Sequence, residues 1–308
     1  SDGLPVGAVA GFCNMMFRMI EKNITENKTT HLAVIFDHKS KTFRSDIFPE
    51  YKANRPPAPD DLIPQFELIK KATLAFNIPC IEVKGYEADD IIASYAVKAR
   101  DSGAEVTIIS SDKDLMQLVG NGISMFDSMK NKKISSLEVK EKFGVEPSRV
   151  IDVQSLAGDS TDNIPGAPGI GIKTAAQLIN EYGDLDNLLN NAKYIKQPKR
   201  RESLIENAKL IRISQKLVTL NQNTPTPLEL SDLEIRNLDI EKSTNFTQEM
   251  EFKTLTKRIE TKFGLVKKEI PNQNPNINKT KKYDSLNSSE MLNIPYENYT
   301  TITELKVL

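Results

Sequence analysis

The chain has 308 residues, which is enough for one large domain or two of moderate size. Hydrophobic residues make up 39% and charged residues 27%, as in ordinary globular proteins, and no apolar stretch or leading hydrophobic segment predicts a membrane helix or signal peptide. The net charge of −1 excludes attraction of nucleic acid through overall charge alone. Cys13 and Cys80 are expected to be buried thiols in a reducing cytoplasm, and His31 and His38 are too few to form a zinc site with them.

The first half of the chain predicts an α/β fold. Apolar residues at helical spacing predict a helix over residues 6–21, and a β-rich apolar run predicts a strand over 32–36. A segment rich in proline and charge, at about 43–64, is interpreted as a long loop or arch. Further helices are expected at about 61–77, 87–100 and 113–119, and strands at about 80–83, 104–110 and 123–126. This alternation predicts a mostly parallel, doubly wound sheet.

Carboxylates follow the predicted strands, in the order Asp37, then Glu87, Asp89 and Asp90, then Asp112 and Asp114. In such sheets the binding crevice lies beyond the carboxyl ends of the strands. Acids in the first turn of a helix also occur simply because they stabilise it, so each cluster alone has a structural explanation. Three clusters together favour cations, since the acids would otherwise repel one another. Oxygen ligands favour Mg²⁺, with Mn²⁺ as a substitute, which predicts a metal-dependent nuclease.

A glycine-rich segment lies further along the chain. Asp159 and Asp162 precede it on a turn-rich stretch, where they could also serve local backbone donors. Around residues 164–180 the pattern predicts a helix-hairpin-helix, whose exposed backbone N–H groups bind phosphates; a tight helix–helix turn is the alternative. The candidate DNA-contacting residues of this segment are Gly166, Gly169, Gly171, Lys173 and Thr174.

Two further sets of basic residues are candidates for phosphate contacts. Near a metal site, the arch residues Lys52 and Arg55 would clamp the scissile phosphate, with Arg44 and Tyr51 as DNA contacts. Without the acids, this segment would be interpreted as a solvated loop. Residues 193–216 hold eight basic residues against two acids, which fits either a DNA-binding helix or a solvated face.

The chain divides into four predicted segments. Residues 1–136 form the α/β core, and residues 137–266 form a helical subdomain that includes a patch from Thr247 to Phe263. Residues 267–295, rich in Lys, Asn, Ser and Pro, are interpreted as a flexible linker. Residues 296–308 regain strand and helix character and are interpreted as the start of a further domain.

Several strings together resemble the flap endonuclease superfamily, in particular the 5′-nuclease domain of bacterial DNA polymerase I. They are Val34-Ile35-Phe36-Asp37, Phe43-Arg44, Tyr51-Lys52-Ala53-Asn54-Arg55, Gly85-Tyr86-Glu87-Ala88-Asp89-Asp90, Ser111-Asp112-Lys113-Asp114-Leu115 and Leu156-Ala157-Gly158-Asp159-Ser160-Thr161-Asp162-Asn163 with the glycine-rich segment that follows. The resemblance covers about residues 3–265 and implies a PIN-like fold, with two-metal-ion hydrolysis of DNA at 5′ flaps.

The resemblance also implies roles for individual residues. Glu87, Asp89, Asp90 and Asp112 would hold one divalent ion with Asp37, and Asp114, Asp159 and Asp162 would hold a second. Lys52 and Arg55 would belong to the arch through which a single-stranded 5′ end passes. The hairpin would bind duplex DNA and a K⁺ ion, and residues 296–308 would open a 3′–5′ exonuclease-like domain with a polymerase domain downstream.

The sequence departs from the family at its start. Family members begin with a strand that ends in a metal-binding aspartate, whereas this sequence starts with Ser1-Asp2-Gly3, and no strand precedes Asp2.

From the resemblance we expect a monomeric, cytoplasmic 5′ nuclease. The alternative is a catalytically silent protein that binds flaps or junctions, because the aspartate of the first strand is absent. A ribonuclease with a related acidic site is a third interpretation, which the glycine hairpin and basic helix disfavour.

Overall fold

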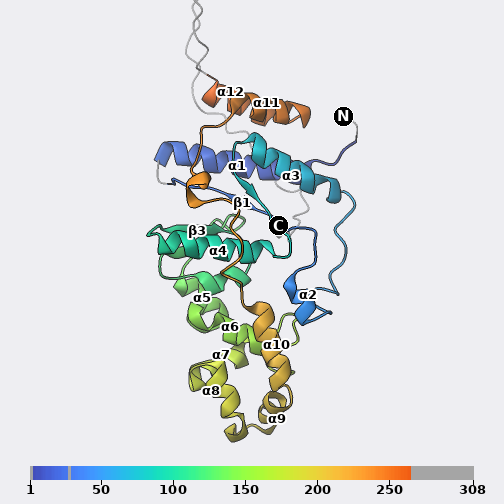
Figure 1. Cartoon of the computed structure of the whole chain (residues 1–308), viewed down its shortest axis with the longest axis vertical. Coiled ribbons are helices and arrows are strands. Elements are labelled where there is room, and N and C mark those ends of the chain that lie inside the picture. Colours follow the sequence, from blue (N-terminus) through green and yellow to red (C-terminus); the bar gives the residue numbers. More distant parts are fainter. Residues whose placement is uncertain (1–2, 27–28, 265–308) are drawn as a thin grey trace, which may run out of the picture.

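The computed structural model describes residues 3–26 and 29–264 (Figure 1). Along the longest axis of the molecule, α12 lies near one end and α8 and α9 lie at the other (Figure 1). The first half contains α1 (Gly7–Glu26), β1 (Val34–Ile35), α2 (Phe43–Ile47), α3 (Ile63–Ala75), β2 (Cys80–Ile81), α4 (Ala88–Asp101), β3 (Val106–Ile109), the 3₁₀ helix η1 (Asp114–Leu118), β4 (Ile123–Asp127) and β5 (Lys132–Ile134).

The second half is helical throughout the described residues. Its elements are α5 (Ser136–Phe143), η2 (Pro147–Arg149), α6 (Val150–Ala157), α7 (Ile172–Tyr182), α8 (Leu185–Asn190), η3 (Ala192–Tyr194), α9 (Pro198–Glu206), α10 (Ala208–Val218), η4 (Leu230–Leu233), α11 (Ile240–Glu249) and α12 (Lys253–Phe263). The predicted fold class, an α/β part followed by helices, is confirmed. Predictions for residues 267–308 lie outside the described part of the chain.

The strands form two short sheets within the described residues. β1 pairs with β2 in parallel, and β3 pairs in parallel with β4, whose other neighbour is the antiparallel β5. The expected single sheet is therefore corrected to two separate ones. Helices bury both sheets: apolar side chains of β1 and β2 pack with α1 and α3 on one side and with α4 on the other, whereas those of β3 and β4 pack with α4 and with α5 to α8.

Two cores stabilise the fold. One contains α1, α3, α11 and α12, with Phe17 and Phe76 almost fully buried. The other joins β3 and β4 to the helices α5 to α8, around Phe143 and Leu156. Burial of an aromatic or leucine side chain contributes about 1.5–3 kcal/mol, so these contacts dominate the stability of the fold.

Capping side chains fix several helix ends. Gln65, buried in α3, accepts hydrogen bonds from the backbone N–H groups of Ala8 and Val9 at 2.8 and 3.3 Å, so it caps the first turn of α1. Ser135 and Glu138 form a capping box at the start of α5. These contacts explain why α1 and α5 start at these positions.

Four local predictions need correction. The segment 43–64, expected to be a loop, contains α2, and the expected helix at 113–119 is the 3₁₀ helix η1. The helical patch from Thr247 to Phe263 is two helices, α11 and α12, joined where Glu251 has a positive φ of 59°. The basic stretch 193–216 is split among η3, α9 and α10. No helix among the described residues is long and apolar enough to cross a membrane.

Candidate active site

A cleft beyond the carboxyl ends of β1 and β3 brings together six of the eight predicted acids. Asp37 follows β1, the next two acids start α4, two more follow β3, and the last lies between α6 and α7. The acids that line the cleft are Asp37, Glu87, Asp89, Asp112, Asp114 and Asp162. Asp90 and Asp159 are not in its lining. Residues up to 125 positions apart in the sequence thus meet at one place.

Three acids of this cleft, Asp37, Asp89 and Asp114, have raised pKa values, first because they are buried and then because other acids lie near them. Burial raises the pKa of Asp89 well above its usual range, and the negative charges of Asp112 and Asp114 raise it further. Burial, with the charge of Asp112, raises the pKa of Asp114 to about 6 although Gln154 donates a hydrogen bond to it at 2.6 Å. Burial raises the pKa of Asp37 as well. Like charges held together out of water favour the binding of a cation.

Basic side chains of the chain itself occupy many of the carboxylate oxygens. Lys52 Nζ lies 2.7 Å from Glu87 Oε1, Arg55 forms an ion pair with Asp162, and Lys113 forms one with Asp159. Within residues 3–26 and 29–264, no three acidic, histidine or cysteine side chains are arranged as a ready coordination shell.

The donor set nevertheless fits divalent metal ions. Six carboxylates supply only oxygen ligands, which is the preference of Mg²⁺ and Mn²⁺. No donor among the described residues forms a hydrogen bond or ion pair with the half-buried Asp89 carboxylate, whose pKa is raised by burial and by the charges of four other acids. Such a carboxylate is suited to a cation that neutralises it.

Asp90 and Arg44 form a buried pair, which changes the interpretation of both. Arg44 is 1% exposed and Asp90 is fully buried. The guanidinium donates to both oxygens of Asp90, at 2.6 and 2.8 Å, and to the carbonyl oxygens of Leu217 and Thr219. Although burial opposes its charge, the bond to Asp90 raises the pKa of Arg44. The predicted DNA contact of Arg44 is corrected, because DNA cannot reach it, and both Asp90 oxygens are already bound.

Tyr51 is also buried rather than displayed on an arch. Its hydroxyl donates to Glu87 Oε2 at 3.1 Å, and the residue is 9% exposed. Burial, followed by the charge of Glu87, raises the pKa of the phenol. Tyr51 therefore orients a carboxylate of the cleft, which corrects the prediction that it contacts DNA.

The arch segment and the acidic loop are joined to each other. The backbone N–H of Lys52 donates to the carbonyl of Asp162 at 2.9 Å, and Lys52 has a positive φ of 57°. Asn163 Nδ2 donates to the carbonyl of Glu50, and Asn54 Nδ2 donates to the carbonyl of Ser160, both at 2.7 Å. These bonds fix Lys52 and Arg55 relative to Asp162.

Two glycines cross at the base of the acidic loop. A Cβ atom on Gly158 would lie 2.5 Å from the carbonyl oxygen of Ile164, and one on Gly166 would lie 2.4 Å from the backbone nitrogen of Gly158. Asp159 and Ile164 exchange backbone hydrogen bonds of 2.8 and 2.7 Å just above the crossing. Gly166 is buried and donates its N–H to Ser214 Oγ at 3.0 Å. Its predicted phosphate contact is therefore corrected to a close backbone approach.

The remaining residues of the predicted hairpin do lie at the surface. Gly169, Gly171 and Lys173 are exposed, Thr174 is partly exposed, and the N-terminus of α7 starts at this turn. Ser203 of α9 donates to the carbonyl of Pro168 at 2.7 Å. The basic helix α9 is thereby held next to the glycine turn.

Four contacts of the site had no clear signal in the sequence. Lys113 stands between two acids and was not expected to pair with Asp159, and Gln154 on α6 showed no sign of reaching Asp114. Asn54 and Asn163 resemble ordinary turn residues. Only the fold brings these partners together.

Two family models match the chain. The model described as 5′-3′ exonuclease, N-terminal resolvase-like domain, matches residues 1–144, and the model described as 5′-3′ exonuclease, C-terminal SAM fold, matches residues 145–241. DNA polymerase I of Rhizobium leguminosarum is 55% identical over 262 residues, which cover 84% of this chain and 26% of that protein. A 5′-3′ exonuclease of Aquifex aeolicus is 37% identical over 265 residues, which cover 85% of this chain and 88% of that protein. The chain thus spans about a quarter of the polymerase relative.

Solved structures show a similar fold. A bacteriophage T5 5′-exonuclease with bound zinc ions has a TM-score of 0.61 and 23% identity, over 81% of this chain and 90% of that one. A T5 flap endonuclease in a complex with DNA and metal ions has a TM-score of 0.61 and 22% identity, over the same shares. At this level of identity, the similarity establishes the fold and nothing further.

Proposed function

Because this chain belongs to the 5′–3′ exonuclease family, we propose that it is a structure-specific nuclease that hydrolyses DNA phosphodiesters at 5′ flaps. The observation that supports this function most is the cleft, where six carboxylates face Lys52 and Arg55. The names of the relatives and the bound metal and DNA of the T5 enzymes agree with it.

Asp37, Glu87, Asp89, Asp112 and Asp114 would hold Mg²⁺ ions, or Mn²⁺ as a substitute, with Asp162 at the edge of the set. When bound, such ions neutralise the carboxylates and polarise the phosphate that is to be cleaved. Asp90 and Asp159 would act indirectly, because neither lines the cleft and Arg44 already binds both oxygens of Asp90.

Lys52 and Arg55 would contact the scissile phosphate. Their side chains are 26% and 30% exposed, so each reaches solvent at the mouth of the cleft while it stays bound to an acid of the site. A phosphate that enters the cleft would replace Glu87 as the ion-pair partner of Lys52, or Asp162 as the partner of Arg55. Positioned cations of this kind stabilise the charge that builds up on the phosphate during cleavage.

The exposed turn at Gly169 and Gly171, with Lys173 and Thr174, would bind the backbone of a DNA duplex without reading its sequence. We also propose K⁺ at this turn, as the resemblance implies. The protein would act as a monomer in the cytoplasm, with a polymerase domain in the full-length protein, as in the relatives named DNA polymerase I.

The test is cleavage of a labelled 5′-flap duplex with and without Mg²⁺. Asp112→Asn should lower turnover by about a hundredfold or more, because a carboxylate of the cleft is lost, and should leave binding of the flap in a chelator unchanged. Asp46→Asn, which changes an exposed aspartate of α2 outside the cleft, is the matched control and should keep full turnover. Full turnover by Asp112→Asn would contradict the site assignment. Binding without cleavage by the unmodified chain would favour the silent DNA-binding protein.

A further inference from the structure

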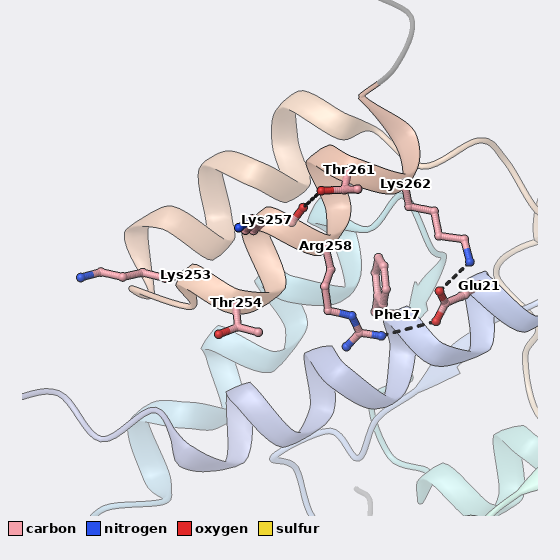
Figure 2. Close-up of a pocket in the computed structure, with 8 residues that line it drawn as sticks. All are labelled: Phe17, Glu21, Lys253, Thr254, Lys257, Arg258, Thr261 and Lys262. Atoms are coloured by element: carbon pink, nitrogen blue, oxygen red, sulfur yellow. Dashed lines mark hydrogen bonds and ion pairs between the residues drawn. The ribbon is translucent and has the colours of Figure 1, made fainter. Parts of the chain in front are cut away.

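A groove on the far side of the molecule from the hairpin is lined by α1 and α12 (Figure 2). Its volume is about 530 Å³. Phe17 and Glu21 come from α1, and the rest of the lining is α12: Lys253, Thr254, Lys257, Arg258, Thr261 and Lys262. Figure 1 shows α12 near one end of the long axis and α9 at the other, with α2 and the start of α4 between them.

The groove carries a net positive charge. Four basic residues against Glu21 alone give 4 − 1 = +3. Lys253 and Lys257 are exposed, one helical turn apart, and no carboxylate of the described residues lies within 4.0 Å of either ammonium. Thr254 adds a hydroxyl group to the same face, whereas the Thr261 hydroxyl donates to the carbonyl of Lys257 at 2.7 Å. The groove therefore suits an anion that is extended along the helix.

Contacts to α1 hold the other two cations in place, which distinguishes this groove from a freely solvated face. The guanidinium of Arg258 lies over the ring of Phe17, 4.6 Å from its centroid, and 3.4 Å from Glu21 (Figure 2). Lys262 also pairs with Glu21. The hydrogen bond from Lys262 lowers the pKa of Glu21, and the charges of Lys262 and Arg258 lower it further. A guanidinium that is already oriented loses less side-chain entropy when it binds phosphate.

We propose that this groove binds the phosphate backbone of DNA, on the opposite side of the cleft from the hairpin. From Lys253 to Lys262, α12 rises about 14 Å, at about 1.5 Å per residue. One strand of B-DNA carries about four phosphates over that length, and the groove supplies four cations. The inference rests on the proposed nuclease function, since a flap substrate has duplex on both sides of the cut.

The experiment measures how the affinity for DNA depends on salt, in a chelator, for the chain and for Lys253→Gln/Lys257→Gln. Three DNAs are compared: a flap with duplex on both sides of the cut, and two versions that each keep only one of the duplexes. Lys132→Gln/Lys133→Gln on β5 removes the same charge from another exposed surface and is the control. Circular dichroism and the urea midpoint check that each variant is folded.

For Lys253→Gln/Lys257→Gln, we expect the slope of log affinity against log salt to become shallower by about 2 with the flap that has duplex on both sides of the cut. The same change is expected with one of the two single-duplex versions, and no change with the other. The loss of affinity between about 50 and 200 mM salt then becomes about twelvefold smaller. Unchanged slopes with all three DNAs, or equal changes with all three, would overturn the proposal.

The proposed nuclease function can fail separately. Mg²⁺-dependent cleavage of the DNA that the groove does not contact should be the same for Lys253→Gln/Lys257→Gln and the unmodified chain. If the unmodified chain cleaves nothing, the nuclease proposal fails, while the slopes still decide whether the groove binds DNA.

Discussion

The crossing of Gly158 and Gly166 leads to a prediction with a matched control. Gly166→Ala would place a Cβ atom 2.4 Å from the nitrogen of Gly158, and the three atoms nearest to that Cβ are all backbone atoms, which cannot rotate away. Gly103→Ala has a comparable positive φ, +88° against +62°, but its Cβ atom would meet nothing within 4 Å. Both substitutions place an alanine in the left-handed backbone region, which costs about 1–2 kcal/mol. The difference between the unfolding free energies of the two variants therefore measures the effect of the crossing alone.

The difference in unfolding free energy between Gly166→Ala and Gly103→Ala can be estimated in two ways. Steric overpacking costs about 1–3 kcal/mol. If the loop opens instead, the paired hydrogen bonds between Asp159 and Ile164 break, at about 1 kcal/mol each. Either route lowers the free energy of unfolding of Gly166→Ala by about 1–3 kcal/mol more than that of Gly103→Ala. This is a large part of the roughly 5–15 kcal/mol that stabilises a typical domain.

Urea unfolding of the two variants measures this difference, and flap cleavage reports on the cleft. Opening the crossing moves Asp162 and the carbonyl group that accepts from the Lys52 N–H, so Gly166→Ala should also lose cleavage under conditions where it is folded. Gly103→Ala should keep it. Unfolding free energies that agree within about 0.5 kcal/mol, with cleavage retained, would refute the reasoning.

Three further predictions concern other parts of the chain. In the native protein at pH 8, Cys13 should react with a thiol reagent far more slowly than Cys80, since burial raises the pKa of Cys13 to about 12 and shields it; equal rates would contradict this. The pKa of Glu138, lowered to about 2 mainly by the hydrogen bond from Ser135, should return towards its ordinary value of 4.5 in Ser135→Ala, as measured by NMR titration. Because that pKa is lowered in the folded state, the capping box should stabilise the fold above about pH 4.5 and lose this contribution as the pH falls towards 2. Asn163→Gly keeps the positive φ but loses the bond to Glu50, so cleavage should slow severalfold with flap affinity unchanged; a loss of affinity alone would count against the positioning role.

Local patterns were sufficient to predict most elements and the acidic cleft. Apolar runs predicted β1 to β4, and because parallel strands end at one edge, the acids after them could be placed together. β5 was missed, since three residues with two lysines give no strand pattern. These predictions depend only on residues close together in the sequence.

Long-range contacts could not be predicted in the same way. Arg44 and Asp90 are 46 residues apart, and nothing near either residue indicates that each is the partner of the other. The glycines at 158 and 166 have the composition of a phosphate-binding turn, yet one of them is needed because another backbone segment passes beside it. The fold, rather than the local sequence, decides which glycine faces solvent.

The buried bonds of Arg44 also determine where the arch segment can bend. Arg44 attaches α2 to α4 through Asp90 and to the end of α10 through two carbonyl groups. Residues 50–55 are attached to the loop that carries Asp162, and Gln65 attaches the start of α3 to α1. Between these anchors lie residues 56–61, which are mostly exposed and include three prolines. A movement that admits a DNA strand would therefore pivot within this short proline-rich stretch, while both ends of the segment stay in place.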